Sequence, residues 1–178
     1  MTDPEGNSMG RLYYENGYAT LAIERFYNHP RTVVWDAMTD NEQLNSWFIA
    51  KVRMIPGSDG FIESWFGQPL LHVEGKITSW EPPHLLEHEW NIQPNDVVPE
   101  GEFSTMRWEL EDLNGGTLLK LTHRNLTKQT MAGFRTGLDP APADHIILER
   151  LESYLSSKPF FDVHTRFTEL KETYHKLP

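Results

Sequence analysis

The chain has 178 residues, of which 38% are hydrophobic and 24% are charged, and these values are typical of one ordinary globular domain. The formal net charge of −10 argues against nucleic acid and anionic membranes as partners, because both are bound by clustered lysine and arginine. The absence of cysteine excludes disulfides, a thiol nucleophile and thiolate metal sites.

The first residues, 1–12, are polar and contain no apolar run, so the sequence predicts a flexible lead-in without signal peptide or membrane anchor, and hence a cytoplasmic protein. Order is expected from about Tyr18. Residues 20–27 alternate in polarity, as a strand does. One face of this strand then carries Leu21, Ile23, Arg25 and Tyr27.

Residues 24–48 predict a strand, a helix, a turn and a second short helix. Pro30 suits the first turn of a helix, because its missing N–H would be unpaired there. One side of that helix is expected to carry Val33, Val34 and Ala37. Thr39 and Glu42 have the spacing of a capping box, which predicts that the second helix begins where the first ends.

Strand-like runs separated by turn residues follow. Turns are predicted at 56–60, at 82–83 and at 114–116, the last joining the sixth and seventh predicted strands. Asn114-Gly115 is the clearest hairpin signal. Because the links between neighbouring strands are short, the sequence predicts an antiparallel meander.

Two helices are predicted after the last strand. A polar connection over 124–139 leads to Asp139, a candidate cap, and to a helix that begins near Pro140. The apolar stripe of that helix consists of Ile147, Leu148, Leu151, Tyr154 and Leu155. A further amphipathic helix in 159–178 either packs on its own domain or forms a homodimer contact.

An ordered series of short matches makes the chain similar to a known family. The series is Glu24-Arg25, Pro30, Val34-Trp35, Ala37, Thr39-Asp40, Trp47-Phe48, Gly60-Phe61, Gly75-Lys76-Ile77, Glu81-Pro82-Pro83, Leu85-Leu86, Trp90, Trp108-Glu109-Leu110, Gly116-Thr117 and Leu121-Thr122-His123. It resembles the activator of heat-shock-protein-90 ATPase homologue 1-like family over residues 18–157. One departure is Ala143-Asp144, where that family often has Gly-Trp at the start of its last helix.

This family belongs to the START-related, birch-pollen-allergen-like superfamily. The resemblance therefore implies an α+β helix-grip fold, in which a curved antiparallel sheet wraps around a long C-terminal helix and two short helices follow the first strand. It implies a single domain over 13–178, with a family-like core at 18–157 and an additional C-terminal helix at 159–178.

A cavity is expected between the sheet and the long helix, because a curved sheet and one helix do not always fill the space between them. The candidate ligand-binding residues are Arg25, Trp47, Phe61, Trp65, His88, Trp90, Met106, Trp108, Leu119, Leu121, His123, Ile147 and Leu151. Their orientation is inferred from apolar alternation, and a shift of one residue would exchange each strand's set for its neighbours. The alternative is that these side chains simply fill the core.

Three polar residues fall on the apolar faces: Arg25, His88 and His123. Each could anchor a carboxylate, phenol or carbonyl of a ligand, or could be a hydrogen-bonded core residue. For Arg25, Glu63 and Glu109 are the candidate salt-bridge partners.

No catalytic residue, metal or cofactor is predicted, because the chain lacks HExxH, GxSxG, P-loop and GxGxxG motifs. Binding of a small hydrophobic or aromatic molecule is the favoured function. The resemblance also implies two alternatives, a regulator of a chaperone ATPase and a cavity-based enzyme of the polyketide cyclase type. The short lead-in disfavours the chaperone partner, because the eukaryotic activators have a separate N-terminal domain.

Overall fold

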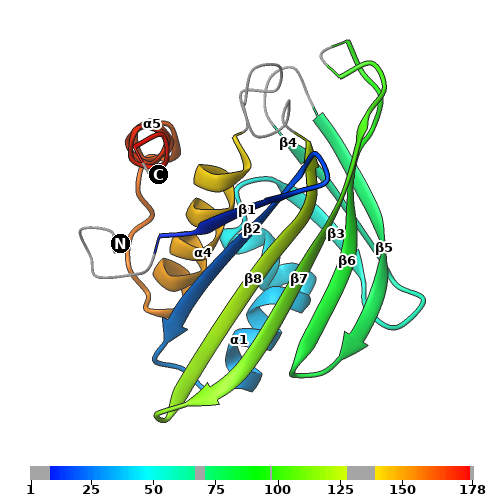
Figure 1. Ribbon diagram of the computed structural model, residues 1–178. Helices are drawn as coiled ribbons and strands as arrows, with labels where there is room; N and C mark the ends of the chain where they lie inside the picture. The colour runs from blue at the N-terminus through cyan, green and yellow to red at the C-terminus, as the bar shows by residue number, and fades with distance from the viewer. Residues whose placement is uncertain (1–8, 67–70, 97, 128–138, 177–178) are drawn as a thin grey trace.

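An eight-stranded antiparallel sheet is the framework of the computed structural model, which describes residues 9–66, 71–96, 98–127 and 139–176. The strands are β1 (Arg11–Glu15), β2 (Tyr18–Tyr27), β3 (Lys51–Ile55), β4 (Phe61–Phe66), β5 (Leu71–Glu81), β6 (Leu85–Ile92), β7 (Glu102–Leu113) and β8 (Gly116–Thr127). Their order across the sheet is β1-β2-β8-β7-β6-β5-β4-β3. The predicted meander from β3 to β8 is therefore confirmed, and β2 pairs with its last strand (Figure 1).

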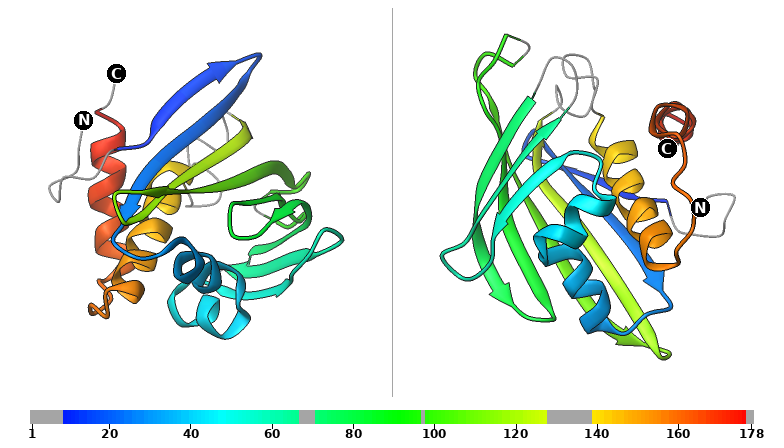
Figure 2. Two further views of the ribbon diagram at one scale, coloured as in Figure 1. Left: turned by 90° about the horizontal axis from the view of Figure 1, so that it is seen from below. Right: turned by 180° about the vertical axis from the view of Figure 1, so that it is seen from behind.

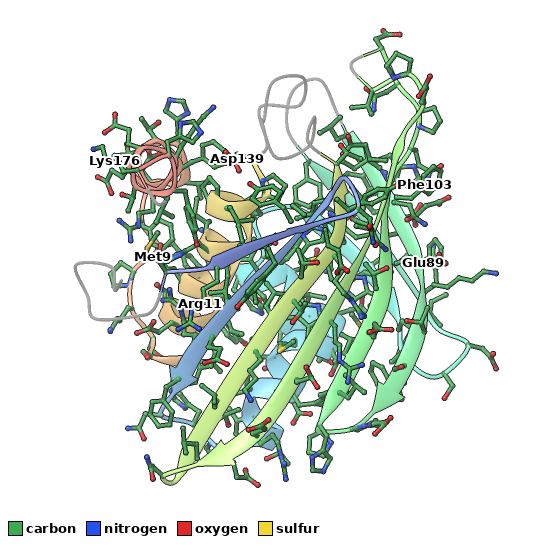
Figure 3. The ribbon with its side chains drawn as sticks, in the orientation of Figure 1. Met9, Arg11, Glu89, Phe103, Asp139 and Lys176 are labelled. Carbon is green, nitrogen blue, oxygen red and sulfur yellow. The ribbon has the colours of Figure 1, made fainter. Side chains whose placement is uncertain are left out.

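The described helices are α1 (Arg31–Thr39), α2 (Asn41–Trp47), α4 (Pro140–Leu155) and α5 (Val163–Tyr174). Figure 2 shows α1 and α4 on the same face of the sheet, which is its inner face. This is the expected α+β helix-grip arrangement, with α4 as the long helix. Side chains of the opposite, outer face include those of Glu89 and Phe103, which are labelled in Figure 3. None of the described helices is long and apolar enough to cross a membrane.

The hairpin between β7 and β8 has the predicted turn. Asn114 and Gly115 have φ values of 49° and 83°, both in the left-handed region. A two-residue turn with positive φ at both positions matches the twist of the strands it joins, and asparagine followed by glycine is the pair that adopts it most easily.

The junction of α1 and α2 differs in detail from the prediction. Asp40, not Thr39, caps α2, and its carboxylate accepts a hydrogen bond of 3.0 Å from the backbone N–H of Gln43. The Thr39 hydroxyl instead donates to the carbonyl of Trp35 in the preceding turn, because Thr39 is still helical. Val33 is also 42% exposed, because it lies on the outer side of α1, away from the buried Val34 and Ala37.

Order begins earlier in the chain than the expected Tyr18. Met9 is buried, and the backbone N–H of Gly10 donates to the Tyr174 hydroxyl at 3.0 Å. The predicted lead-in boundary at residue 12 therefore falls inside β1. This strand was missed because its side chains are mostly exposed and its residues are polar or amphipathic, so no burial pattern marks it.

Helix α5 packs against α4, as the first of the two alternatives for the C-terminal segment supposed. Leu170 and Tyr174 are buried, and Arg166 donates two hydrogen bonds, of 2.9 and 2.6 Å, to the carboxylate of Glu149 in α4. Burial by itself raises the pKa of Glu149, but the hydrogen bonds from Arg166, together with the nearby His145 ring, outweigh it and lower the pKa to about 2. A homodimer contact of α5 stays a prediction.

We predict that Glu149→Gln lowers the free energy of unfolding by about 2 kcal/mol, because it leaves the guanidinium of Arg166 without its buried carboxylate. Glu169→Gln is the matched control, since Glu169 pairs with the same arginine at 3.0 Å but is largely exposed. Glu169→Gln should lower the free energy of unfolding by less than about 0.5 kcal/mol. Urea unfolding measures both, and equal losses would contradict a structural role for the Glu149 pair.

Candidate functional site

A first cavity lies under α2 on the inner face of the sheet, and we call it the α2 cavity. Its volume is about 30 Å³. Its walls are formed by Met38, Leu44, Trp47, Phe48, Val52, Met54, Ile62, Leu86, His88, Trp90, Met106 and Trp108. Two asparagines of α2 fix this helix over β3. Asn41 and Asn45 each donate to one backbone carbonyl of β3 and accept from one backbone N–H of it.

A second cavity, the α4 cavity, lies between the inner face of the sheet and the first turns of α4. Its walls are formed by Ile49, Phe66, Val73, Trp90, Ile92, Glu102, Ser104, His123, Leu126, Pro140, Ala143, Asp144 and Ile147. Its volume is about 50 Å³. The predicted cap holds the start of α4 in place, since the Asp139 carboxylate accepts from the N–H of Ala141.

Aromatic side chains separate the two cavities. Trp90 lines both, and Phe48 and Phe66 meet its ring edge-on at centroid distances of 6.5 and 5.6 Å. We call these three residues the aromatic partition. Each cavity by itself has room for a few water molecules and is much smaller than the cavity of about 150 Å³ that is known to bind benzene in another protein. Side chains therefore fill most of the space that the sequence predicted to be hollow.

Most of the predicted lining residues point inward. Trp47, His88, Trp90, Met106 and Trp108 line the α2 cavity. His123 and Ile147 line the α4 cavity, together with Trp90. Leu119, Leu121 and Leu151 are fully buried core residues outside both sets of walls. Whether any of these residues contacts a ligand stays a prediction.

The predicted orientation of β4 is wrong by one residue. Phe61 and Trp65 lie on the outer face, while Ile62, Ser64 and Phe66 are buried on the inner one. The Trp65 ring stacks on that of His72, with centroids 5.5 Å apart. Both faces of β4 carry large apolar side chains, so alternation alone does not distinguish them.

Arg25 is buried as predicted, but its partners come from α4 and not from the sheet. Its guanidinium donates to Glu152 at 3.1 Å and to His145 Nε2 at 3.0 Å. Glu63 and Glu109, the expected partners, lie on the outer face and pair with Arg53 and Arg107. Arg25 is therefore a bridge between β2 and α4, and it lines neither cavity.

His88 is a fully hydrogen-bonded core residue. Its Nδ1–H donates to the carbonyl of Glu89 at 2.9 Å, and its Nε2 accepts from the indole N–H of Trp108 at 3.2 Å. Burial lowers the pKa of His88 to about 4. The ring is therefore neutral at neutral pH, and both of its nitrogens are used inside the protein.

His123 has a different environment, at the wall of the α4 cavity. Its Nδ1 is 2.8 Å from a carboxylate oxygen of Asp144, and its Nε2 is 2.9 Å from the hydroxyl of Ser104. That hydroxyl is also 2.8 Å from the backbone carbonyl of Trp90. His123 and Asp144 are only 3% and 4% exposed. The result is a continuous serine, histidine and aspartate chain beside an apolar space.

Two of these three hydrogen-bonded side chains, Asp144 and Ser104, were not among the predicted site residues. Asp144 precedes Ile147 by three residues, so it lies on the apolar stripe of α4, and a carboxylate there is a signal that could have been used. Ser104 gives no such signal. It faces the cavity because it is paired with Trp90 across β6 and β7, and only the strand register brings it next to His123.

Two other places in the structure bring charged side chains together. On the outer face, Glu63, His72 and Glu74 hold ligand-type atoms within 4.8 Å of one another, in the part of the chain that the structure describes. The guanidinium of Arg53 is 3.9 Å from Glu63 and competes with a cation there.

A polar cleft of about 380 Å³ separates α4 and α5. Its main charges already pair with each other, Arg166 with Glu149 and Glu169, and Lys158 with Glu152. This cleft is therefore explained by the attachment of α5 to α4, and the α4 cavity is the better candidate site.

Residues 28–155 match the family described as activator of Hsp90 ATPase homolog 1-like protein. The fold is similar to that of CalU16 from Micromonospora echinospora, with 22% identity, a TM-score of 0.67, and 94% of this chain and 92% of that chain covered. A conserved protein of unknown function from Enterococcus faecalis has 15% identity and a TM-score of 0.66, covering 95% and 92%.

DynU16, a protein in the dynemicin biosynthetic locus, has 18% identity and a TM-score of 0.63 over 82% of this chain and 49% of that chain. No curated protein matches the sequence. At these identities the solved structures establish the fold, and the function must be argued from the site.

We predict that His88 makes stability depend on pH. The unfolded chain binds a proton at a pKa of about 6.5 but the folded chain only at about 4, so stability is full above about pH 6.5 and falls between these values. Between these pH values the free energy of unfolding falls by about 3 kcal/mol. Urea unfolding at about pH 7 and about pH 4 should show a smaller loss for His88→Gln than for the unaltered protein. The control is His72→Gln on the outer face, where His72 is only half-buried. An unchanged pH dependence in His88→Gln would contradict the assignment.

Proposed function

The chain belongs to the activator of Hsp90 ATPase homologue 1-like family, and from that premise we propose that it binds a small hydrophobic or aromatic molecule in the α4 cavity. The observation that carries the proposal is the pair of polar atoms, His123 Nε2 and Ser104 Oγ, at the wall of an otherwise mainly apolar space. Small-molecule sites have this composition, because apolar walls give affinity and a few placed polar groups give orientation.

The ligand's polar group is expected to be a hydroxyl or a carbonyl. Ser104 can donate to a carbonyl or accept from a hydroxyl, and the neutral form of His123 accepts at Nε2. The apolar part of the ligand would contact Ile147, Val73 and Ile92, which lie around these polar atoms in the cavity wall.

Ligand binding requires the aromatic partition to move, because neither cavity alone holds an aromatic ring. Trp90 and Phe48 are only partly buried, so their side chains have room to turn toward solvent. Their displacement would join the α2 and α4 cavities into one site. Binding is therefore expected to change the fluorescence of Trp90.

Similarity to DynU16 supports the choice of ligands for a first test. That protein is in the dynemicin biosynthetic locus, which makes polycyclic aromatic and polyketide-like compounds a reasonable panel beside lipids and simple phenolics. Of the two alternative functions, the serine, histidine and aspartate chain favours a cavity-based enzyme over a chaperone regulator, because a polar chain inside a cavity has no use in binding a protein surface.

We predict that a ligand from this panel, at about 100 times its Kd, stabilises the protein by about 2.7 kcal/mol in thermal unfolding. Ala143→Leu fills the α4 cavity without touching its polar atoms, so it should weaken binding about tenfold or more. Ala22→Leu adds the same atoms on the outer face of β2 and is the matched control. If Ala143→Leu binds the ligand as tightly as the control does, the ligand binds outside the α4 cavity.

A further inference from the structure

We propose that His123 is a general base, held by Asp144 and connected to Ser104, which removes an acidic hydrogen from a molecule bound in the α4 cavity. The inference rests on the ligand binding proposed above and adds a reaction to it. The substrate class is an apolar carbon acid, a molecule whose C–H bond lies next to a carbonyl or another electron-withdrawing group.

The first argument is the orientation of the imidazole ring. The carboxylate of Asp144, 2.8 Å from Nδ1, accepts the hydrogen of that nitrogen and so fixes the tautomer. The lone pair of Nε2 then points to Ser104 and to the wall of the cavity. A base oriented by a carboxylate and connected to a hydroxyl is the arrangement that general-base and nucleophilic catalysis both use.

The side chains of Ser104, His123 and Asp144 can all be hydrogen-bonded both when His123 is neutral and when it is protonated. The Ser104 hydroxyl has one hydrogen and two acceptors in reach, His123 Nε2 at 2.9 Å and the Trp90 carbonyl at 2.8 Å. When His123 is neutral, the hydroxyl donates to Nε2. When Nε2 carries a proton it donates to the Ser104 oxygen, and the hydroxyl turns to the Trp90 carbonyl. Gaining a proton therefore requires only the rotation of one hydroxyl.

His88 shows by contrast what is special about His123. Both rings are buried on the inner face, but Nε2 of His88 is occupied by the indole N–H of Trp108, and its Nδ1–H meets a backbone carbonyl. A proton on Nε2 of His88 would point at another donor. Of these two histidines, only His123 has a carboxylate at one ring nitrogen and a hydroxyl at the other.

The geometry favours proton abstraction over attack by Ser104. Acyl transfer needs donors for the oxyanion, and the nearest candidates are the backbone N–H groups at the start of α4. Pro140 and Pro142 have none, and those of Ala141 and Ala143 donate to Asp139 at 3.3 and 3.1 Å. Within the described segments, the start of α4 therefore offers no free backbone donor to an oxyanion.

The proposed step is balanced without an oxidant or reductant. The C–H bond of the substrate breaks, its electron pair moves to the neighbouring carbonyl oxygen or expels a bonded heteroatom, and the proton passes to Nε2, directly or through Ser104. The proton then returns to the product or leaves to water. The mainly apolar surroundings assist the step, because they give the base little solvation to lose.

The test uses 5-nitrobenzisoxazole, a flat aromatic carbon acid. Removal of its ring C–H proton breaks the N–O bond and gives a coloured cyanonitrophenolate, so absorbance reports the reaction. Binding is measured separately through tryptophan fluorescence. The unaltered protein should bind the probe and convert it faster than buffer alone does.

His123→Gln should lower kcat by about 100-fold or more, which is the usual contribution of a general base. Asp144→Asn should lower kcat and alter the pH profile with little change in KM, because Asp144 is a positioning residue. Ser104→Ala should change the pH profile if the proton passes through the hydroxyl. The matched control is His72→Gln, which removes a histidine paired with a carboxylate at 2.9 Å on the outer face, and it should keep full activity.

The outcomes separate the two proposals. A protein that does not bind the probe or any member of the ligand panel overturns both. Binding with a rate no higher than that of buffer, or with a rate that His123→Gln leaves unchanged, overturns only the general base. If His123→Gln does not fold, Asp144→Asn and Ser104→Ala decide, and a kcat that both variants leave unchanged overturns the inference.

Discussion

Buried hydrogen bonds attach helix α4 to the inner face of the sheet, and the rest of the structure depends on this attachment. Near its start, Asp144 meets His123 of β8; further along, His145 and Glu152 meet Arg25 of β2, and the carbonyl of Leu148 accepts from the Tyr27 hydroxyl. Apolar packing alone would let the helix slide or turn, whereas these bonds fix its register on the strands. The α4 cavity exists because α4 is held in this position.

Charged and polar groups in a core are costly unless each is paired, and here the pairing has two different outcomes. At Arg25 the partners enclose the guanidinium, so the group stabilises the helix and reaches no cavity. At His123, by contrast, the hydrogen-bonded side chains of Ser104, His123 and Asp144 form part of the wall of the α4 cavity. The same kind of interaction thus serves as a structural bridge at one point and as a candidate site at another.

Aromatic side chains decide how much of the space is open. The resemblance to a cavity-containing family predicted a hollow interior, and the aromatic partition of Phe48, Phe66 and Trp90 reduces it to two small cavities. These rings meet edge-on, and Phe48 and Trp90 are only partly buried, whereas Leu119, Leu121 and Leu151 of the core are fully buried. The proposed ligand site therefore depends on the displacement of these rings.

The sequence by itself determined the strands from β2 to β8, the two helices after β2 and the long helix, because alternation, proline, caps and the Asn114-Gly115 turn act over a few residues; it did not reveal β1. It also predicted that His123 faces inward. Only the tertiary structure decided the orientation of β4, where both faces are apolar, and the partners of Arg25. It alone brought Ser104 and Asp144 to His123, because strand register and helix position join residues 19 and 21 positions apart in the chain. No local pattern encodes such a meeting, since it arises from packing between distant segments.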